Sequence, residues 1–295
     1  MERAEWTRPD DDTTLVGIVG TTDGIDSAAI DRTVTDHDAT VVAGPLEEIL
    51  ERSPSILVCV GQTALCAVAR ADVSVPVLPV DAGDGVRSVS TARLPAIIDA
   101  VLAGAGLERQ YSTLRVETAD PVVGSDSNSN SDSGSSSDFS SDSDSPSESR
   151  PRQAFFDVAL VTEEPARISE YSVTSQGERL AQFRADGVVV ATPQGSHGYA
   201  SAAGGPLLSN GLDAVAVVPV APFVTQTRQW IVPHDGLELT VERDEGPVTL
   251  QVDDRSIGTV TAGSPISITT ADPLSILVPD GEWPTSETGA GTTLD

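Results

Sequence analysis

RADGVVVATPQGSHGYASAAGGP, residues 184–206, is the stretch that decides the fold assignment. The branched apolar run Val188-Val189-Val190 is typical of a buried strand. The segment that follows it holds four glycines and a tyrosine, and glycine permits positive φ and a close approach of the backbone to a ligand. The glycine spacing matches neither the GxGxxG pattern nor the GxxxxGK[ST] phosphate loop. The residues alone favour a structural turn, with small residues packed against a neighbour, at least as much as a ligand-binding loop.

The same stretch resembles the signature of the NAD kinase family, which reads ADG, an apolar run and then TPTGSTAYSLSAGGP. The next segment, LDAVAVVPVAPF, resembles the following strand of that family, and QVDDRSIGTVTAGSPISITTA resembles its late hairpin around an Asp-Gly pair, here Asp253-Asp254. Upstream, VPVLPVDAGDGVRSVS lies where the family has an apolar-GVN-GxLGFL segment. The resemblance covers roughly residues 14–280 and is densest over 184–222.

This resemblance implies an N-terminal α/β domain, a C-terminal β domain and a site in the cleft between them. The implied reaction is ATP-dependent phosphorylation of the NAD 2′-hydroxyl to give NADP. NAD, NADP and ATP are therefore the expected ligands, Mg²⁺ is expected only with ATP, and no tightly bound prosthetic group or protein-held metal is expected. Members of the family are usually oligomers, so a homo-oligomer is expected.

The family's GGDG motif, whose aspartate is taken as the base near the 2′-hydroxyl, falls on VGQT, residues 60–63. Gln62 stands at the position of that aspartate. A glutamine amide cannot accept a proton at neutral pH, although it can hydrogen-bond to a ribose. Asp81 and Asp84 lie in the segment that lines the family's cleft, and we hypothesise that one of them acts as a substitute base.

The family's Asn-Glu/Asp pair, which grips the nucleotide, reads Phe156-Asp157, so the carboxylate is kept and the amide is lost. Tyr199 matches a family tyrosine that contacts the dinucleotide. His197 fits a ligand contact and an ordinary surface histidine almost equally. The resemblance implies that the following positions bind the nucleotide: Gly61, Thr63, Asp157, Asp186, Gly195, Ser196, His197, Gly198, Tyr199, Ala202, Gly204 and Gly205. The alternative function is a catalytically impaired protein that binds a dinucleotide or another nucleotide as a sensor or regulatory subunit.

The composition narrows the possible surroundings and partners. The 295 residues include 45 acidic and 17 basic side chains, all of the latter arginine, for a net charge of −28. Such a surface suits a salt-rich cytosol, where screening suppresses self-repulsion, and we interpret it as that of a divergent, haloarchaeal-type member. It disfavours nucleic acids and anionic membranes as partners. An acidic disordered protein is disfavoured by 39% hydrophobic residues arranged in runs.

Periodicity predicts two kinds of domain. Apolar runs at 13–20, 39–44, 55–61 and 75–83 alternate with helical patterns at 23–37, 46–52, 63–71 and 91–106, which predicts a Rossmann-like parallel sheet. After residue 153, short β-rich runs separated by turn residues predict an all-β, sandwich-like half with two packed sheets.

The expected domains are residues 13–120 and 153–280. They flank a Ser/Asp-rich insertion, 124–152, which is predicted to be disordered because it can bury little apolar surface, and a frayed tail follows at 281–295. Cys59 and Cys66 are predicted to be buried structural thiols. With no apolar leader and no apolar run near the roughly 20 residues that span a bilayer, the chain is predicted to be soluble and cytoplasmic.

Overall fold

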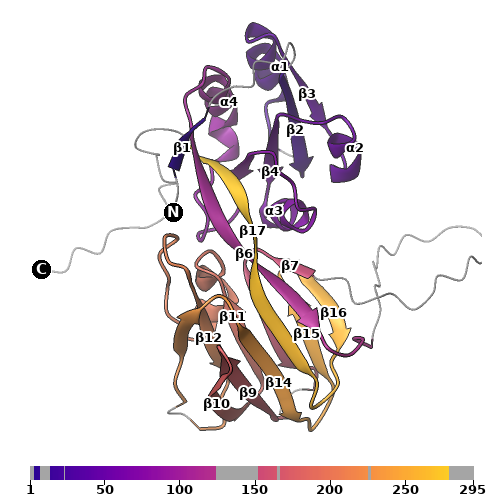
Figure 1. Cartoon of the computed structure of the whole chain (residues 1–295). Coiled ribbons are helices and arrows are strands. Elements are labelled where there is room, and N and C mark those ends of the chain that lie inside the picture. The colour runs from indigo at the N-terminus through magenta and orange to yellow at the C-terminus, as the bar shows by residue number, and fades with distance from the viewer. Residues whose placement is uncertain are drawn as a thin grey trace, which may run out of the picture. The chain divides into compact units, whose positions relative to one another are not determined.

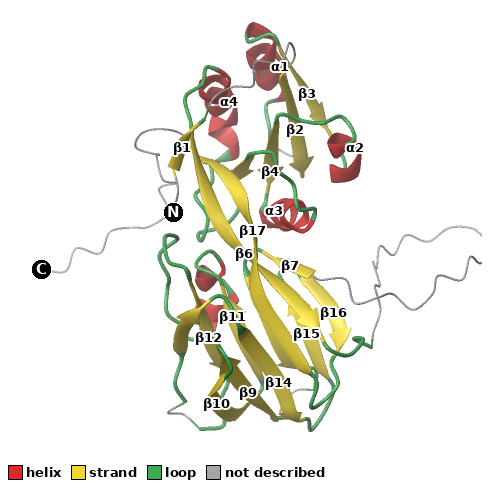
Figure 2. Cartoon of the chain, viewed as in Figure 1, coloured by secondary structure: helices red, strands yellow, loops and turns green. Residues whose placement is uncertain are grey.

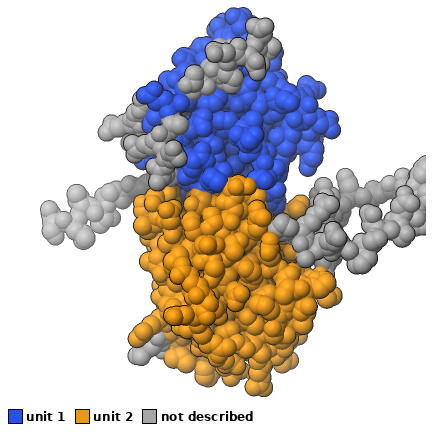
Figure 3. Space-filling view, in the orientation of Figure 1, with its two compact units in different colours: residues 1–111, 273–295 blue, residues 112–272 orange. Residues whose placement is uncertain are grey.

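The computed structural model describes residues 3–6, 14–22, 24–123, 152–164, 167–224 and 227–278. The chain divides into two compact units, residues 1–111 with 273–295 and residues 112–272, shown in two colours in Figure 3. The predicted insertion lies outside the described residues except for Arg152, and so does the predicted tail. Among the helices of the described ranges, none has the length and apolarity needed to cross a membrane.

Unit 1 is built around a parallel sheet, which confirms the predicted class (Figure 1). Its strands run in the order β3, β2, β4, β5, and all three pairings within this set are parallel. The C-terminal part of β17 (Pro265–Val278) adds a parallel strand next to β5 through the pair Ile276–Val77. The elements are β2 (Thr14–Gly20), α1 (Ser27–Asp36), β3 (Ala39–Ala43), α2 (Leu46–Leu50), β4 (Ile56–Val60), α3 (Gln62–Arg70), β5 (Val77–Val80), η1 (Thr91–Arg93) and α4 (Leu94–Leu102).

Local sequence explains where these helices begin and which side they bury. The Asp26 side chain accepts a hydrogen bond from the Ala29 N–H at 2.9 Å and so caps α1. Ile30 and Val34, four residues apart, are the buried residues of that helix. The helix predicted at 91–106 is instead a short 3-10 turn followed by α4, and the backbone of Gly104 has a positive φ of 82° just beyond the helix end.

Over its described residues, unit 2 is all-β apart from two short turns of helix, as predicted (Figure 2). One sheet has the order β13, β12, β11, β8, β15, β16, and every pairing in it is antiparallel. The other has β10, β9, β14 and β17, again antiparallel. The bounds are β7 (Arg152–Ala154), β8 (Asp157–Thr162), β9 (Ser169–Ser175), β10 (Glu178–Ala185), β11 (Gly187–Ala191), η2 (Gly195–His197), α5 (Tyr199–Ala202), β12 (Ala214–Val220), β13 (Trp230–Pro233), β14 (Leu237–Arg243), β15 (Val248–Val252), β16 (Arg255–Thr259) and β17 (Pro265–Val278).

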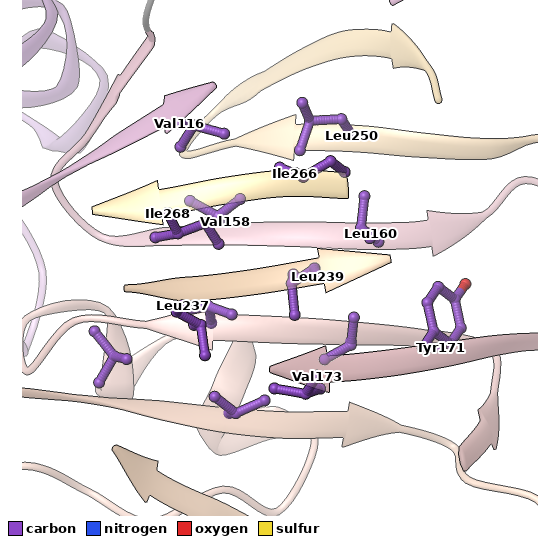
Figure 4. Packing of buried hydrophobic residues seen from close by; sticks show 14 of the residues in the cluster. Val116, Val158, Leu160, Tyr171, Val173, Leu237, Leu239, Leu250, Ile266 and Ile268 are labelled. Carbon is purple, nitrogen blue, oxygen red and sulfur yellow. The ribbon is translucent and has the colours of Figure 1, made fainter. Parts of the chain in front are cut away.

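One buried cluster joins the two sheets of unit 2. It takes Val158 and Leu160 from β8, Leu250 from β15, and Leu239 and Ile266 from the other sheet, all at most 1% exposed (Figure 4). Alternate residues along each strand supply this core, so a shift of one residue in register would expose it. The register of β8, β11 and β15 is therefore fixed, and these are the strands whose ends carry the candidate site.

Among the strands that were not predicted are β1 (Arg3–Glu5) and β6 (Leu107–Thr118). β1 pairs antiparallel with β6, and β6 also pairs with β7. The β6 sequence, LERQYSTLRVET, is rich in charged and polar residues, and its inward positions include Tyr111, Thr113 and Leu114. Threonine and tyrosine at buried positions weaken the apolar alternation by which a strand is read from sequence.

Candidate functional site

The turn after β11 is fastened to the start of β8. Thr192 is 1% exposed, its backbone N–H donates to the Phe156 carbonyl at 2.9 Å, and its hydroxyl lies 2.8 Å from the Phe155 carbonyl and 2.9 Å from that of Phe156. The same hydroxyl accepts a hydrogen bond from the Gly195 N–H at 3.1 Å. The threonine thereby closes the turn internally and ties it to the residues just before Asp157.

Position 195 requires glycine because its backbone lies very close to the backbone of Phe156. A Cβ placed at this position would lie 1.9 Å from the Phe156 carbonyl oxygen and 2.4 Å from its carbon. Neither atom belongs to a flexible side chain that could move aside. From the residues alone, a structural turn was favoured here at least as much as a ligand-binding loop, and the contact with Phe156 supplies the structural reason for the glycine.

Ser196 also serves the turn. It is fully buried, its hydroxyl donates to the Pro193 carbonyl at 2.7 Å, and the same oxygen accepts from the Leu208 N–H at 2.9 Å. The two residues that follow, His197 and Gly198, are exposed. Tyr199, the first residue of α5, is half-buried and packs against an apolar cluster that includes Ala200.

The Asp253 carboxylate is surrounded by three consecutive backbone N–H donors at the start of β8. It accepts hydrogen bonds from the N–H groups of Phe155 at 2.9 Å, Phe156 at 2.7 Å and Asp157 at 3.1 Å. Asp253 itself has a left-handed backbone, with φ of 51°, at the turn between β15 and β16. Aspartate tolerates this conformation better than most residues. The hairpin turn thus fixes the chain segment that presents Asp157.

Asp157 is the carboxyl group of this site with the most unusual electrostatics. Burial, and secondarily the negative charge of Asp253, raise its pKa from 3.8 to about 7. Burial, together with the charges of Asp157 and Asp186, also raises the pKa of the Tyr199 phenol. Perturbed groups that influence one another are typical of functional sites. Near neutral pH, Asp157 is therefore present in both its proton-donating and its proton-accepting form.

Gln194, between Thr192 and Gly195, is a residue that the sequence-based site prediction omitted. Gln194 is only 2% exposed, and its Oε1 atom has no hydrogen-bond partner among the described residues. Buried polar atoms without partners are rare in folded proteins. The only signal in the sequence was glutamine where the family signature has threonine.

The predicted positions in unit 1 gather at the end of β4 and after β5. Gly61, with φ of 85°, ends β4 and caps α3, and Gln62 and Thr63 follow, both exposed, in the first turn of that helix. Gly83 has φ of 90°, and a Cβ there would lie 3.7 Å from Gln62 Oε1. The structure therefore brings the glutamine next to the segment that holds Asp81 and Asp84.

The two hypothesised substitute bases differ in their surroundings. The Asp81 carboxylate accepts hydrogen bonds from the Thr91 backbone N–H at 3.1 Å and from the Thr91 hydroxyl, and its backbone has φ of 46°. These contacts hold the start of η1 in place, so the Asp81 carboxylate has a structural role. Asp84 is exposed.

The remaining predicted binding positions occupy the loop around α5 and the entry to β11. Asp186 is half-buried, and its carbonyl accepts the Thr162 N–H at 2.9 Å, as expected of a turn into the strand. Ala202 and Gly204 are exposed, whereas a Cβ on Gly205 would lie 2.7 Å from the Ala200 carbonyl oxygen. In the part of the chain that the structure describes, no three His, Cys, Asp or Glu side chains are grouped to hold a metal ion.

Comparison with known proteins gives three kinds of match. Residues 157–275 match the family model of the ATP-NAD kinase C-terminal domain. The NAD kinase of Methanosarcina acetivorans is 45% identical over 86 residues, 29% of this chain and 31% of that protein. The NAD kinase of Methanoculleus marisnigri is 31% identical over 42% of this chain and 46% of its own length. The chain thus aligns with less than half of the length of these relatives.

Two solved structures share the fold over most of the chain. Yeast NADH kinase complexed with NADH gives a TM-score of 0.69 at 18% identity, covering 91% of this chain and 84% of that chain. An NAD kinase from Archaeoglobus fulgidus in complex with ATP gives a TM-score of 0.66 at 19% identity, covering 90% and 94%. These likenesses confirm the predicted fold class.

Proposed function

The chain belongs to the NAD kinase family, and from this premise we propose that it binds a nicotinamide adenine dinucleotide at the turn after β11 and phosphorylates its 2′-hydroxyl with ATP. The observation that supports this best is the arrangement around Asp157. The Asp157 carboxyl group has a pKa of about 7, and the backbone just before it is held by the Asp253 carboxylate. The glycine-containing turn after β11 and the half-buried Tyr199 belong to the same site. All of these residues except Phe155 and Phe156 fall inside the segment that matches the family domain.

In this proposal the protein acts mainly by positioning the reactants, as phosphoryl transfer requires little covalent chemistry from the enzyme. The 2′-oxygen attacks the γ-phosphorus, the bond to the β–γ bridging oxygen breaks, and ADP leaves with Mg²⁺. We assign the hydroxyl proton to Asp157, because a base works best when its pKa lies near the working pH. Asp81 is already occupied by Thr91, which makes it a weaker candidate.

A second candidate function is favoured by Gln62. Its amide cannot take a proton at the position where the family has an aspartate, and the flanking Val60 and Thr63 replace glycines. In that case the chain binds the dinucleotide without phosphorylating it and acts as a sensor or regulatory subunit. Both candidates share the same binding site and differ only in turnover.

One experiment tests both candidates. The full chain is titrated in molar KCl with NAD, NADP and MgATP, thermal unfolding is followed, and NADP formation is measured in the same samples. A ligand that binds only the folded state raises the apparent stability by mass action. A rise in melting temperature together with NADP formation supports the kinase, and a rise without product supports the binding protein. No rise with any of these ligands contradicts both.

The surroundings and assembly of the protein are also proposals. The net charge of −28 is the reason for proposing a salt-rich cytoplasm, in which stability should increase with KCl concentration. A homo-oligomer is proposed because the family is usually oligomeric, and light scattering in molar salt gives its mass directly.

A further inference from the structure

Every other polar side chain of the turn 192–196 is used to hold the turn together. The Thr192 hydroxyl serves two carbonyls and the Gly195 N–H. The Ser196 hydroxyl serves the Pro193 carbonyl and the Leu208 N–H. The turn is therefore complete without any contribution from the Gln194 amide.

Gln194 nevertheless carries an amide into a place where water is largely excluded. The residue is 2% exposed, and no described group donates a hydrogen bond to its Oε1 atom. An unpaired buried acceptor is unfavourable, whereas an apolar side chain of similar length would be neutral or stabilising there. A methionine would fill the same volume without this penalty. The unpaired Oε1 atom thus lowers stability without holding the fold, which points to a role in binding.

The position of Gln194 limits what it can bind. Gln194 comes directly before Gly195, whose backbone lies against the Phe156 carbonyl. Because Phe156 comes directly before Asp157, the Gln194 backbone lies at the same strand ends as the proposed dinucleotide site. Oε1 is a neutral acceptor and needs an N–H or O–H donor. It does not attract phosphate, which carries only acceptor oxygens at neutral pH. The complementary ligand group is an uncharged donor such as the –NH₂ of a base or a carboxamide.

We propose that Gln194 is a specificity-determining residue whose Oε1 accepts a hydrogen bond from an –NH₂ group of the bound dinucleotide. This inference rests on the proposed function, because it names the group by which the same site selects its ligand. NAD offers two such groups, the adenine amine and the nicotinamide carboxamide. A site built to pair with a donor discriminates strongly against analogues that lack it, because its own buried polar atom is then left unpaired.

The test is calorimetric titration of the full-length wild type and Gln194→Met in molar KCl with three ligands. These are NAD, its hypoxanthine analogue, which lacks the adenine amine, and its nicotinic acid analogue, which lacks the carboxamide –NH₂. The wild type is expected to bind one of the two analogues at least tenfold more weakly than NAD, and that analogue identifies the donor. Gln194→Met is expected to bind NAD about tenfold or more weakly and to lose the preference, while its melting temperature stays equal or rises.

Gln182→Met is the matched control, because Gln182 is exposed and hydrogen-bonds to Arg179 and Glu170 on the surface of β10. It should leave the affinity for NAD unchanged. Gln194→Leu provides a second apolar variant should the methionine variant fold poorly. Unchanged NAD affinity and preference in the Gln194 variants overturn the inference and leave the proposed function intact. A wild type that binds none of the three ligands overturns both.

Discussion

The backbone N–H of Asp157 donates to the Asp253 carboxylate at 3.1 Å, while burial, and secondarily the negative charge of that same carboxylate, raise the pKa of the Asp157 side chain to about 7. Asp253 thus holds the Asp157 backbone in place, while its negative charge disfavours ionisation of the Asp157 side chain. The position is fixed through the backbone, and the side chain is left to titrate near neutrality. The position of the Asp157 backbone and the charge of its side chain are therefore governed by different interactions with the same neighbour.

Asp157→Asn should stabilise the protein at alkaline pH. In the unfolded chain this carboxyl ionises around pH 3.8, whereas in the folded chain it stays protonated up to about pH 7. Stability associated with the protonated group is complete below pH 3.8 and is lost as the pH rises towards and through 7. The variant should be more stable than the wild type by about 2–4 kcal/mol at pH 8 and nearly equal at pH 4. Urea unfolding at the two pH values measures this difference.

Asp244→Asn is a suitable control for that measurement, because Asp244 is an exposed aspartate in the same unit. It should change stability by less than about 0.5 kcal/mol at either pH. If Asp157→Asn changes the stability at pH 8 as little as this control does, burial and Asp253 do not raise the pKa of the Asp157 carboxyl group as described.

Removing the Asp253 carboxylate should destabilise unit 2. Asp253→Ala leaves the three N–H groups of residues 155–157 without this acceptor and places alanine at φ of 51°, for an expected loss of about 2–4 kcal/mol. Asp253→Asn keeps one acceptor oxygen and a residue that tolerates this backbone, so it should lose about half as much. It should also lower the pKa of Asp157, which an NMR titration of that carboxyl detects. A pKa that does not move would contradict the electrostatic link.

Local pattern was enough to predict the class of each half of the chain. The strand–helix alternation before residue 106 predicted the parallel sheet, and short β-rich runs predicted the antiparallel sheets. Both patterns arise from residues that are close to one another in the sequence, so they can be recognised without the structure. Strand β6 was missed because two of its buried positions carry Tyr111 and Thr113, whose polar atoms weaken the apolar alternation.

The chemistry of the site could not be predicted in the same way. Asp253 meets residues 155–157 across 96 to 98 positions of sequence, and the raised pKa of Asp157 depends on burial that only the folded strands create. A family signature can nominate Ser196 as a ligand contact, but only the structure shows its hydroxyl bonded to the Pro193 carbonyl. Gln194 was overlooked because an orphaned amide is visible only once its neighbours are in place.

Gly195→Ala should prevent the turn from forming as it does. The added carbon would lie 1.9 Å from the Phe156 carbonyl oxygen, so two backbone segments would have to separate. We expect a loss of at least about 3 kcal/mol in the free energy of unfolding. Gly246→Ala is the comparison variant, because its Cβ would lie no closer than 3.7 Å to any atom. Thermal unfolding in molar KCl measures both, and similar melting temperatures would refute the close contact.

Ser196→Ala should affect stability first and ligand binding only through it. The substitution removes the donor to the Pro193 carbonyl and the acceptor of the Leu208 N–H in a fully buried place, for an expected loss of about 1–3 kcal/mol. Under conditions where the variant is fully folded, its affinity for NAD should stay within about threefold of the wild type. A large loss of affinity at unchanged stability would instead make the hydroxyl a ligand contact.

Asp157→Asn should also slow turnover if Asp157 accepts the proton of the 2′-hydroxyl, as proposed. Loss of a general base typically lowers the rate by about 10²–10⁴-fold, while the affinity for NAD should be largely kept. Asp244→Asn, at an exposed aspartate of the same unit, should leave the rate unchanged. Rates of NADP formation and NAD affinities of the wild type and both variants measure these effects. An Asp157→Asn variant that is as fast as the wild type would mean that another group takes the proton.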